Sequence, residues 1–225
     1  MGAIPSILKK NLKELFASIK GKGKASLAIL GLDSAGKTTL VNLFKNADSG
    51  RDFKAQTQPT LGFNMEEVNF ANTNIKIWDI GGQKVLIDFW HQYVNDVDGL
   101  VFMIDIADEK RFKYSFEAFT TLVPHLKDNL PILIFLNKKD IFRDNPTEIS
   151  QRKASIEETY KIDNHTSITD SYMKADSKVF KVKISEVSVL DDLDSMQRNM
   201  ALSSVSVYPG FKWLIEEIKS YGMHK

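Results

Sequence analysis

The sequence predicts an α/β fold, in which an open, mostly parallel sheet of six strands carries helices on both faces. Short, continuous apolar runs recur along the chain, as expected of parallel strands that are buried on both sides. Segments with helical spacing of apolar residues separate these runs. The chain has 225 residues, 43% of them hydrophobic, which suits one well-packed main domain with a small appendage.

The first 24 residues are predicted to be an amphipathic helix followed by a short hinge, ahead of a main domain at 25–225. Six lysines against one glutamate give residues 1–24 a side-chain charge of +5, in a chain of net charge +1. Such a helix suits an anionic lipid surface. A surface helix packed permanently on the domain is the alternative; a basic arm for nucleic acid is disfavoured, because no nucleic-acid motif accompanies it. The apolar stripe consists of Ile4, Ile7, Leu8, Leu12, Leu15, Phe16 and Ile19.

The remaining elements follow in chain order. "SLAILG" reads as a buried strand, and "KTTLVNLFKN" reads as the helix after it. Alternation on both sides of Asn72 predicts a hairpin over 63–80. "GLVFMIDI" and "PILIFLN" are further buried strands, with a helical segment at 108–128 between them, and "YPGFKWLIEEIKSY" is a terminal helix. Residues 163–196 fit this alternation poorly, so we interpret them as an insertion with its own hairpin.

Several classes of protein are excluded by composition. The chain has no cysteine, which rules out disulfides, zinc–thiolate sites, prenylation and palmitoylation. No apolar run is long enough to cross a bilayer, and the amino terminus lacks the pattern of a signal peptide. The four histidines show no metal-ligand spacing. We therefore expect a soluble cytoplasmic protein, monomeric in solution.

The stretch "GLDSAGKTT", residues 31–39, has the pattern of a phosphate-binding loop. It follows a predicted strand and opens a predicted helix, so its main-chain N–H groups would face an anion. Lys37 is expected to hold the β- and γ-phosphates, and the Thr38 hydroxyl to bind Mg²⁺. The residues expected to contact the nucleotide here are Asp33, Ser34, Ala35, Gly36, Lys37, Thr38 and Thr39.

"NKKD", residues 137–140, predicts which base is bound. It follows an apolar run, which places it at the carboxyl end of a strand, where open α/β sheets bind ligands. The Asp140 carboxylate can accept two hydrogen bonds from guanine, and adenine offers no such pair on that edge. Asn137 can brace the loop, and the stem of Lys138 can cover the base. An ATP-dependent enzyme with the same phosphate loop is the alternative.

A third segment, "WDIGGQ" at 78–83, ends another predicted strand. Asp79 is placed to reach Mg²⁺, and the N–H of Gly82 to contact a γ-phosphate. Gln83 can orient an attacking water. Thr60, upstream, can add its hydroxyl to Mg²⁺ when a triphosphate is bound. Segments 47–62 and 81–93 would then order around the γ-phosphate.

Taken together, "GLDSAGKTT", "PTLGFN", "WDIGGQ" and "NKKD", in this order, resemble the Arf family of small GTPases, including Arf-like and Sar-type members. The resemblance covers residues 1–142 and 200–222. It implies a P-loop NTPase of the small-GTPase (Ras-like) fold that binds GTP or GDP with Mg²⁺. It also implies that "ALS", 201–203, backs the base, with Ala201 and Leu202 beside the guanine. Phe63, Trp78 and Tyr93 match the aromatic triad through which Arf proteins engage effectors.

The resemblance also implies a switch that works at membranes. Hydrolysis would be slow, because "AQTQPT", which ends at the switch threonine, contains no arginine, and an activating protein's arginine finger would accelerate it. An exchange factor and effectors would be its other partners. The amino-terminal helix would reach a membrane in the GTP-bound state, and Gly2 fits an N-myristoylation signal. The alternative is a scaffold subunit that binds GTP with little hydrolysis.

Overall fold

The computed structural model describes residues 24–49, 60, 62–70, 73–164, 171–175, 177–198 and 200–222. The predicted amino-terminal helix, Gly2, and most of the segment expected to contact the γ-phosphate at 47–62 lie outside these residues. Among the described helices, none has the length and apolarity that crossing a membrane requires.

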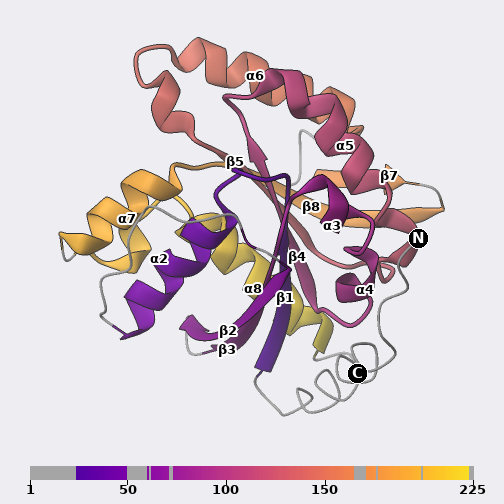
Figure 1. Ribbon diagram of the computed structural model, residues 1–225, viewed down its shortest axis with the longest axis horizontal. Helices are drawn as coiled ribbons and strands as arrows, with labels where there is room; N and C mark the ends of the chain where they lie inside the picture. Colours follow the sequence, from indigo (N-terminus) through magenta and orange to yellow (C-terminus); the bar gives the residue numbers. More distant parts are fainter. Residues whose placement is uncertain are drawn as a thin grey trace.

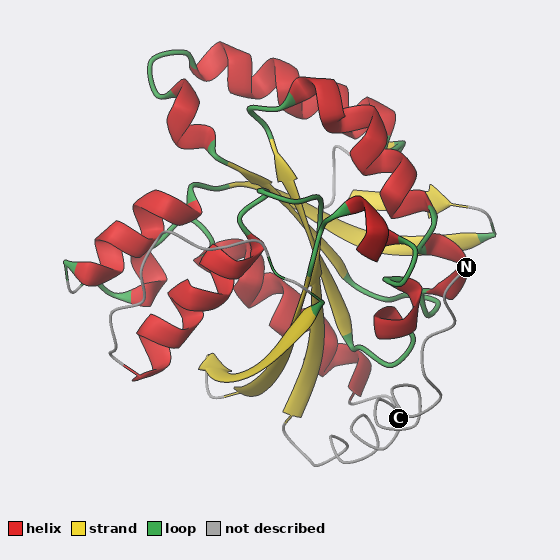
Figure 2. Ribbon diagram, viewed as in Figure 1, coloured by secondary structure: helices red, strands yellow, loops and turns green. Residues whose placement is uncertain are grey.

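The fold is an α/β sandwich around one twisted sheet of eight strands in the order β2-β3-β1-β4-β5-β8-β7-β6 (Figures 1 and 2). β3, β1, β4, β5 and β8 run parallel, and the strands at both edges are antiparallel to their neighbours. The predicted fold class is confirmed, but the described sheet has eight strands where six were expected. The strands are β1 (Lys24–Leu30), β2 (Phe63–Phe70), β3 (Thr73–Ile80), β4 (Gly99–Asp105), β5 (Ile132–Asn137), β6 (Ile162–Asn164), β7 (Ser171–Ala175) and β8 (Lys178–Glu186).

Helices cover both faces of the sheet (Figure 2). The α-helices are α2 (Lys37–Ser49), α3 (Lys84–Ile87), α4 (His91–Val94), α5 (Phe112–Thr120), α6 (Pro146–Thr159), α7 (Val189–Gln197) and α8 (Tyr208–Gly222). Short 3-10 helices lie at η1 (Glu109–Arg111), η2 (Val123–His125), η3 (Lys139–Phe142) and η4 (Leu202–Ser204).

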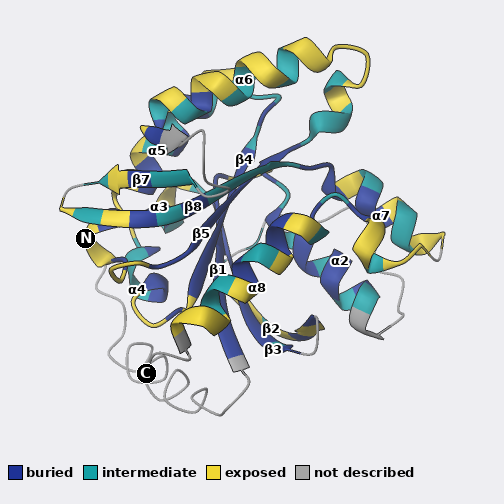
Figure 3. Cartoon of the chain, turned by 180° about the vertical axis from the view of Figure 1, so that it is seen from behind, coloured by how far each residue is buried: buried dark blue, intermediate teal, exposed yellow. Residues whose placement is uncertain are grey.

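Two apolar cores lie on opposite faces of the sheet, because neighbouring strand residues point in opposite directions. In β4, Phe102 joins the core that includes the buried residues of α4, α5 and α6, whereas Met103 joins the core of α2, α7 and α8. The central strands β4 and β5 are buried along nearly their whole length (Figure 3). This burial explains why the sequence shows them as unbroken apolar runs. It also holds the polar ends of the strands in fixed positions.

The predicted hairpin is confirmed as β2 and β3, which pair antiparallel from Phe63↔Ile80 to Phe70↔Thr73. The predicted insertion at 163–196 proves to contain a strand of the central sheet. β8 pairs parallel with β5, from Ile132↔Val182 to Leu136↔Glu186. The additional elements are therefore β6 and β7, which extend the sheet beyond β8, and α7, which follows it. The alternation of "KVFKVKISE" is the local signal for β8, and only pairing with β5 shows that it belongs to the centre.

Candidate nucleotide-binding site

The phosphate-binding loop connects the end of β1 to the start of α2. Its backbone is left-handed at Gly31 (φ 142°) and Gly36 (φ 98°), which favours glycine at both positions. A Cβ at Gly31 would lie 2.2 Å from the carbonyl oxygen of Met103, and one at Gly36 would lie 2.3 Å from Nδ2 of Asn137. The loop is thus packed so tightly against β4 and β5 that only glycine fits at these two positions. No side chain there shields the main-chain N–H groups from a ligand.

Lys37 is the buried cation of this loop. Its Nζ donates to the carbonyl oxygens of Gly31 and Leu32, both at 2.9 Å, and the residue is only 6% exposed. Burial lowers the pKa of Lys37 to about 8, although the nearby carboxylates of Asp79 and Asp33 oppose that shift. An anion placed in the loop would give this ammonium group the counter-charge that it needs.

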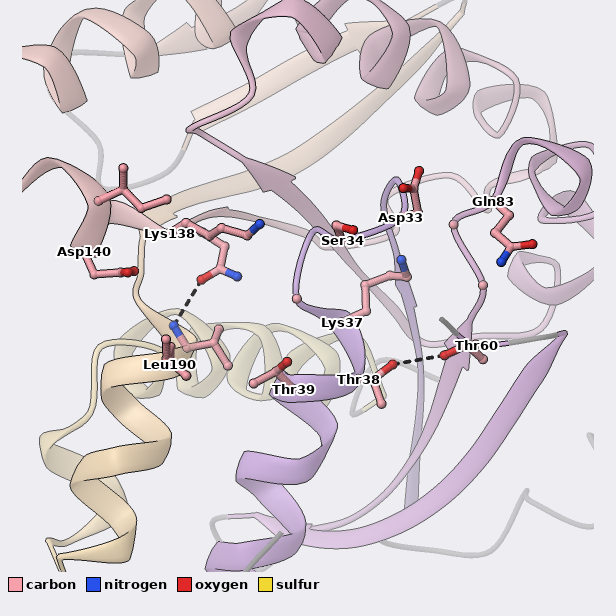
Figure 4. Close-up of a pocket in the computed structure, with 16 residues that line it drawn as sticks. Asp33, Ser34, Lys37, Thr38, Thr39, Thr60, Gln83, Lys138, Asp140 and Leu190 are labelled. Carbon is pink, nitrogen blue, oxygen red and sulfur yellow. Dashed lines mark hydrogen bonds between the residues drawn. The ribbon is translucent and has the colours of Figure 1, made fainter. Parts of the chain in front are cut away.

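Three oxygen-bearing side chains meet at the start of α2. The hydroxyl of Thr38 donates to Oδ2 of Asp79 at 2.7 Å, and it lies 3.0 Å from the hydroxyl of Thr60 (Figure 4). The other carboxylate oxygen of Asp79, Oδ1, is buried without a hydrogen-bond partner. Burial also raises the pKa of Asp79. Carboxylate and hydroxyl oxygens are the ligands that Mg²⁺ prefers, so these residues fit that ion, which would satisfy the orphaned oxygen.

The segment after β3 approaches the phosphate-binding loop directly. The N–H of Asp33 donates to the carbonyl of Gly82 at 3.0 Å, and a Cβ at Gly82 would lie 2.3 Å from the carbonyl carbon of Leu32. Gln83 follows, and it lines a cavity that the phosphate-binding loop also lines. Two further bonds to Gly81 hold this segment: its carbonyl accepts from Trp90 Nε1 at 3.0 Å, and its N–H donates to Gly62 at 2.9 Å.

The predicted base-side residues lie at the carboxyl end of β5. Asn137 braces both halves of the site, because its Nδ2 donates to the carbonyl of Ala35 at 2.8 Å and its Oδ1 accepts from the N–H of Val189 at 3.1 Å. Lys138 adopts a left-handed backbone (φ 71°), and its ammonium group pairs with Asp105 at 2.6 Å. That pair lays the side chain beside the cavity wall.

The loop at 201–203, predicted to back the base, lies outside the cavity. Ala201 and Leu202 do not line the cavity, and Leu202 lies in η4, beyond helix α7. Val189 and Leu190 line the cavity in their place. The reason is the order of strands: β8 is the neighbour of β5, so the loop that leaves β8 lies beside Asn137 and Asp140. The signal available in the sequence was the polar serine at 188, two residues after the end of β8.

One cavity of about 540 Å³ is lined at one end by the phosphate-binding loop and its neighbours, here called the phosphate side. At the other end it is lined by residues 137–141 and 189–190, here called the base side. That volume falls within the range of small-molecule and cofactor sites. The residues that line it come from five separated segments of the chain, and predicted site residues come from four of these (Figure 4). They are Asp33, Ser34, Gly36, Lys37, Thr38, Thr39, Thr60, Gly82, Gln83, Asn137, Lys138 and Asp140, joined by Gly81, Ile141, Val189 and Leu190, which the sequence did not indicate. Ala35 and Asp79 act from behind the wall, through the contacts given above.

The predicted aromatic triad forms a cluster. The ring centroids of Phe63 and Tyr93 lie 5.2 Å apart, and those of Phe63 and Trp78 lie 5.9 Å apart. Trp78 is fully buried and Tyr93 is 7% exposed, whereas Phe63 is partly buried. Trp78 also donates its indole N–H to the hydroxyl of Ser26 at 3.3 Å. Phe63 therefore has the largest accessible surface of the three, and it packs against the buried ring of Trp78.

Comparisons with known proteins agree with this geometry. The ADP-ribosylation factor family model matches residues 11–218. An ADP-ribosylation factor of Encephalitozoon cuniculi is 31% identical over 97% of this chain and 94% of its own length. The ADP-ribosylation factor-like protein 3 of Chlamydomonas reinhardtii is 39% identical over 54% of this chain and 67% of its own length.

Solved structures show the same fold. The small COPII coat GTPase SAR1 of Encephalitozoon cuniculi, in complex with GDP, is 25% identical at a TM-score of 0.60, covering 97% of this chain and 90% of its own. The Arl6 BBS3 small GTPase of Trypanosoma brucei, with the bound nucleotide analogue GppNp, is 18% identical at a TM-score of 0.59. That alignment covers 88% of this chain and 98% of the other.

Proposed function

This chain belongs to the ADP-ribosylation factor family of small GTPases, and we propose that it is a Mg²⁺-dependent switch that alternates between GTP and GDP. The observation that carries the proposal is the single cavity lined by both Lys37 and Asp140. Asn137 ties the two ends together through its bond to the carbonyl of Ala35. The relatives named above include one protein in complex with GDP, in agreement with guanine nucleotides as the ligand.

In this proposal each part of the cavity has one task. Lys37 and the amides of the phosphate-binding loop hold the phosphates. Asp140 accepts from the guanine edge, and Val189 and Leu190, the first two residues of α7, back the base. Mg²⁺, when bound, would neutralise charge on the phosphate oxygens; Thr38, Thr60 and Asp79 would hold it.

We propose that hydrolysis is slow. Gln83 lines the cavity and would orient the attacking water. Among the described residues that line the cavity there is no arginine. Arg111 lies close by, but its guanidinium pairs with Asp108 at 2.5 Å and with Asp33 at 3.1 Å, outside the cavity wall. An activating protein would therefore supply the arginine, which is worth roughly 10³–10⁵-fold in other GTPases.

Hydrolysis is tested by single-turnover assays on the Gln83→Leu variant. We expect the variant to bind GTP with near-normal affinity and to hydrolyse it about tenfold more slowly or worse, because the water loses its orienting group. Gln197→Leu, an exposed glutamine on α7, is the matched control and should leave the rate unchanged. Equal rates in the wild type and Gln83→Leu would favour the scaffold alternative.

We propose that the GTP-bound form is recruited from the cytoplasm to membranes through residues 1–24, and that it regulates membrane traffic through effectors that contact Phe63 and its aromatic neighbours. The apolar stripe and the charge of +5 in this segment suit an anionic surface. Flotation with anionic liposomes tests this, with the protein loaded either with GDP or with a non-hydrolysable GTP analogue. We expect flotation only with the analogue; equal flotation of the two forms would contradict the coupling.

A further inference from the structure

A chain of hydrogen bonds runs from Asp140 away from the cavity, into a part of the molecule that the proposed function does not use. The hydroxyl of Ser188 donates to Oδ1 of Asp140 at 2.8 Å. The N–H of Ser188 donates to the hydroxyl oxygen of Ser206 at 3.1 Å. The Ser206 hydroxyl in turn donates to Oδ2 of Asp192 at 2.7 Å. Ser188 and Ser206 are eighteen residues apart, and α7 lies between them.

Asp192 is the buried end of this chain. It lies in the first turn of α7, and it is only 5% exposed. Besides the Ser206 hydroxyl, its carboxylate accepts from the N–H of Ser206 at 2.7 Å and from the N–H of Val207 at 3.0 Å. Three donors satisfy a carboxylate that burial would otherwise penalise. Asp192 therefore fixes the short connection ahead of α8 with unusual strength for a loop.

The direction of each bond in the chain is determined. A serine hydroxyl has one proton to donate and can also accept. Because Ser206 gives its proton to Asp192, it presents a lone pair to the N–H of Ser188. Ser188 caps α7 by accepting from the N–H of Asp191 at 3.2 Å, so its own proton is directed to Asp140. The bonds thus connect the Asp192 carboxylate to the Asp140 carboxylate through Ser206 and Ser188.

We propose that Asp192 and Ser206 are positioning residues for base selection: through Ser188 they hold the Asp140 carboxylate in the orientation that accepts both the N1–H and the 2-amino group of guanine. This inference rests on the proposed guanine site. It assigns a role to α7, whose first residues line the base side of the cavity and which packs on α2. The helix therefore supports the base side of the cavity as well as the core.

Inosine diphosphate tests this role, because inosine lacks only the 2-amino group of guanosine. Affinities for GDP and for inosine diphosphate are measured with Mg²⁺ in the full chain, for the wild type, Ser206→Ala and Asp192→Asn. We expect the wild type to prefer GDP. In both variants the preference should fall by about threefold to tenfold, the range of one ordinary hydrogen bond, because the bond to the 2-amino group is weakened by misplacement and not removed. GDP should lose affinity while inosine diphosphate changes little.

Two further variants separate positioning from stability. Ser206→Thr keeps the hydroxyl and should retain the wild-type preference. Asp194→Asn, at an exposed position on the same helix, should also retain it. Equal losses for both nucleotides in Ser206→Ala would mean a merely structural role and would overturn the inference. Ser206 is only half-buried, so this variant decides the question even where Asp192→Asn does not fold.

The outcomes also separate this inference from the proposed function. A wild-type protein that prefers GDP, beside a folded Ser206→Ala variant with an unchanged preference, overturns the positioning role alone. A wild-type protein that binds neither nucleotide overturns both.

Discussion

The phosphate side and the base side of the cavity are built in different ways. The phosphate side is dominated by one continuous segment, the loop from Gly31 to Lys37 and the first turn of α2. The base side is assembled from the carboxyl end of β5, from the first residues of α7 after β8, and from residues near Ser206 that do not line the cavity. A continuous segment carries its own geometry, whereas an assembled wall depends on which strands are neighbours. The comparison explains why most residues predicted for the phosphate side line the cavity, whereas Ala201 and Leu202, predicted for the base side, do not.

The two sides meet at Asn137, whose amide group bonds to both. Its Nδ2 holds the phosphate-binding loop at Ala35, and its Oδ1 holds the start of α7 at Val189. Nucleotide affinity should therefore depend on each side separately and on this joint. The four variants or conditions that follow test these contributions, from the largest expected effect to the smallest.

Lys37→Ala removes the buried cation of the phosphate side and should have the largest effect. We expect GDP affinity to fall by about 2–5 kcal/mol, the usual cost of truncating one partner of a buried charge pair. Isothermal titration with Mg²⁺ measures the loss. Lys212→Ala, an exposed lysine on α8, is the control and should bind normally. A Lys37→Ala protein with wild-type affinity would show that the phosphate side does not hold the ligand.

Gly36→Ala should disrupt the bond from Asn137 to the carbonyl of Ala35, which connects the two sides. The new Cβ would lie 2.3 Å from Nδ2 of Asn137 at a φ of 98°, so strain and the loss of the Asn137 bond should together cost at least ~2 kcal/mol of nucleotide affinity. Gly62→Ala is the matched control: its φ is 96°, but nothing lies within 4 Å of the new Cβ. We expect Gly62→Ala to lose only about 1 kcal/mol of nucleotide affinity, from backbone strain alone. Equal effects in the two variants would show that the joint is unimportant.

Asp140→Asn tests the base side by exchanging an acceptor for a donor. GDP should lose about 2–3 kcal/mol of affinity, because one or both hydrogen bonds to the charged carboxylate are lost. Xanthosine diphosphate should gain affinity instead, since its 2-oxo group can accept from the new amide. Competition of the two nucleotides against a fluorescent analogue measures both changes. An unchanged preference would show that Asp140 does not read the base.

The pH dependence of binding tests the charge on Lys37. In the nucleotide-free protein its pKa is about 8, and bound phosphate should raise that value. The bound state then holds more protons, so affinity should fall as pH rises above 8, by up to about tenfold per unit. The nucleotide-free protein should show the opposite trend from this group, with stability gained between pH 8 and 10.5, because the unfolded lysine binds the proton more tightly. Titrations at pH 7 to 9.5 in two buffers test the first effect, and proton uptake on binding should appear in their heats.

Several features were predictable because they are local. The loop at 31–39 requires its glycines where the backbone is left-handed, and the strand and helix on either side follow from apolar spacing alone. Asp140 and Asn137 were also correctly placed, because a polar end on a buried strand marks the ligand-binding edge of a parallel sheet. In each case the residues that decide the geometry stand next to one another in the chain.

What the sequence by itself determined is most of the residues that line the cavity and the edge of the sheet, at the carboxyl ends of the strands, where they gather. Only the tertiary structure decided that β8 is the partner of β5, and hence that Val189 and Leu190, rather than Ala201 and Leu202, line the cavity. The tie from Asp140 to Asp192 is of the same kind, because it joins residues 52 positions apart through Ser188 and Ser206. The physical reason is that strand order depends on burial summed over the entire sheet, and no short stretch of residues contains that sum.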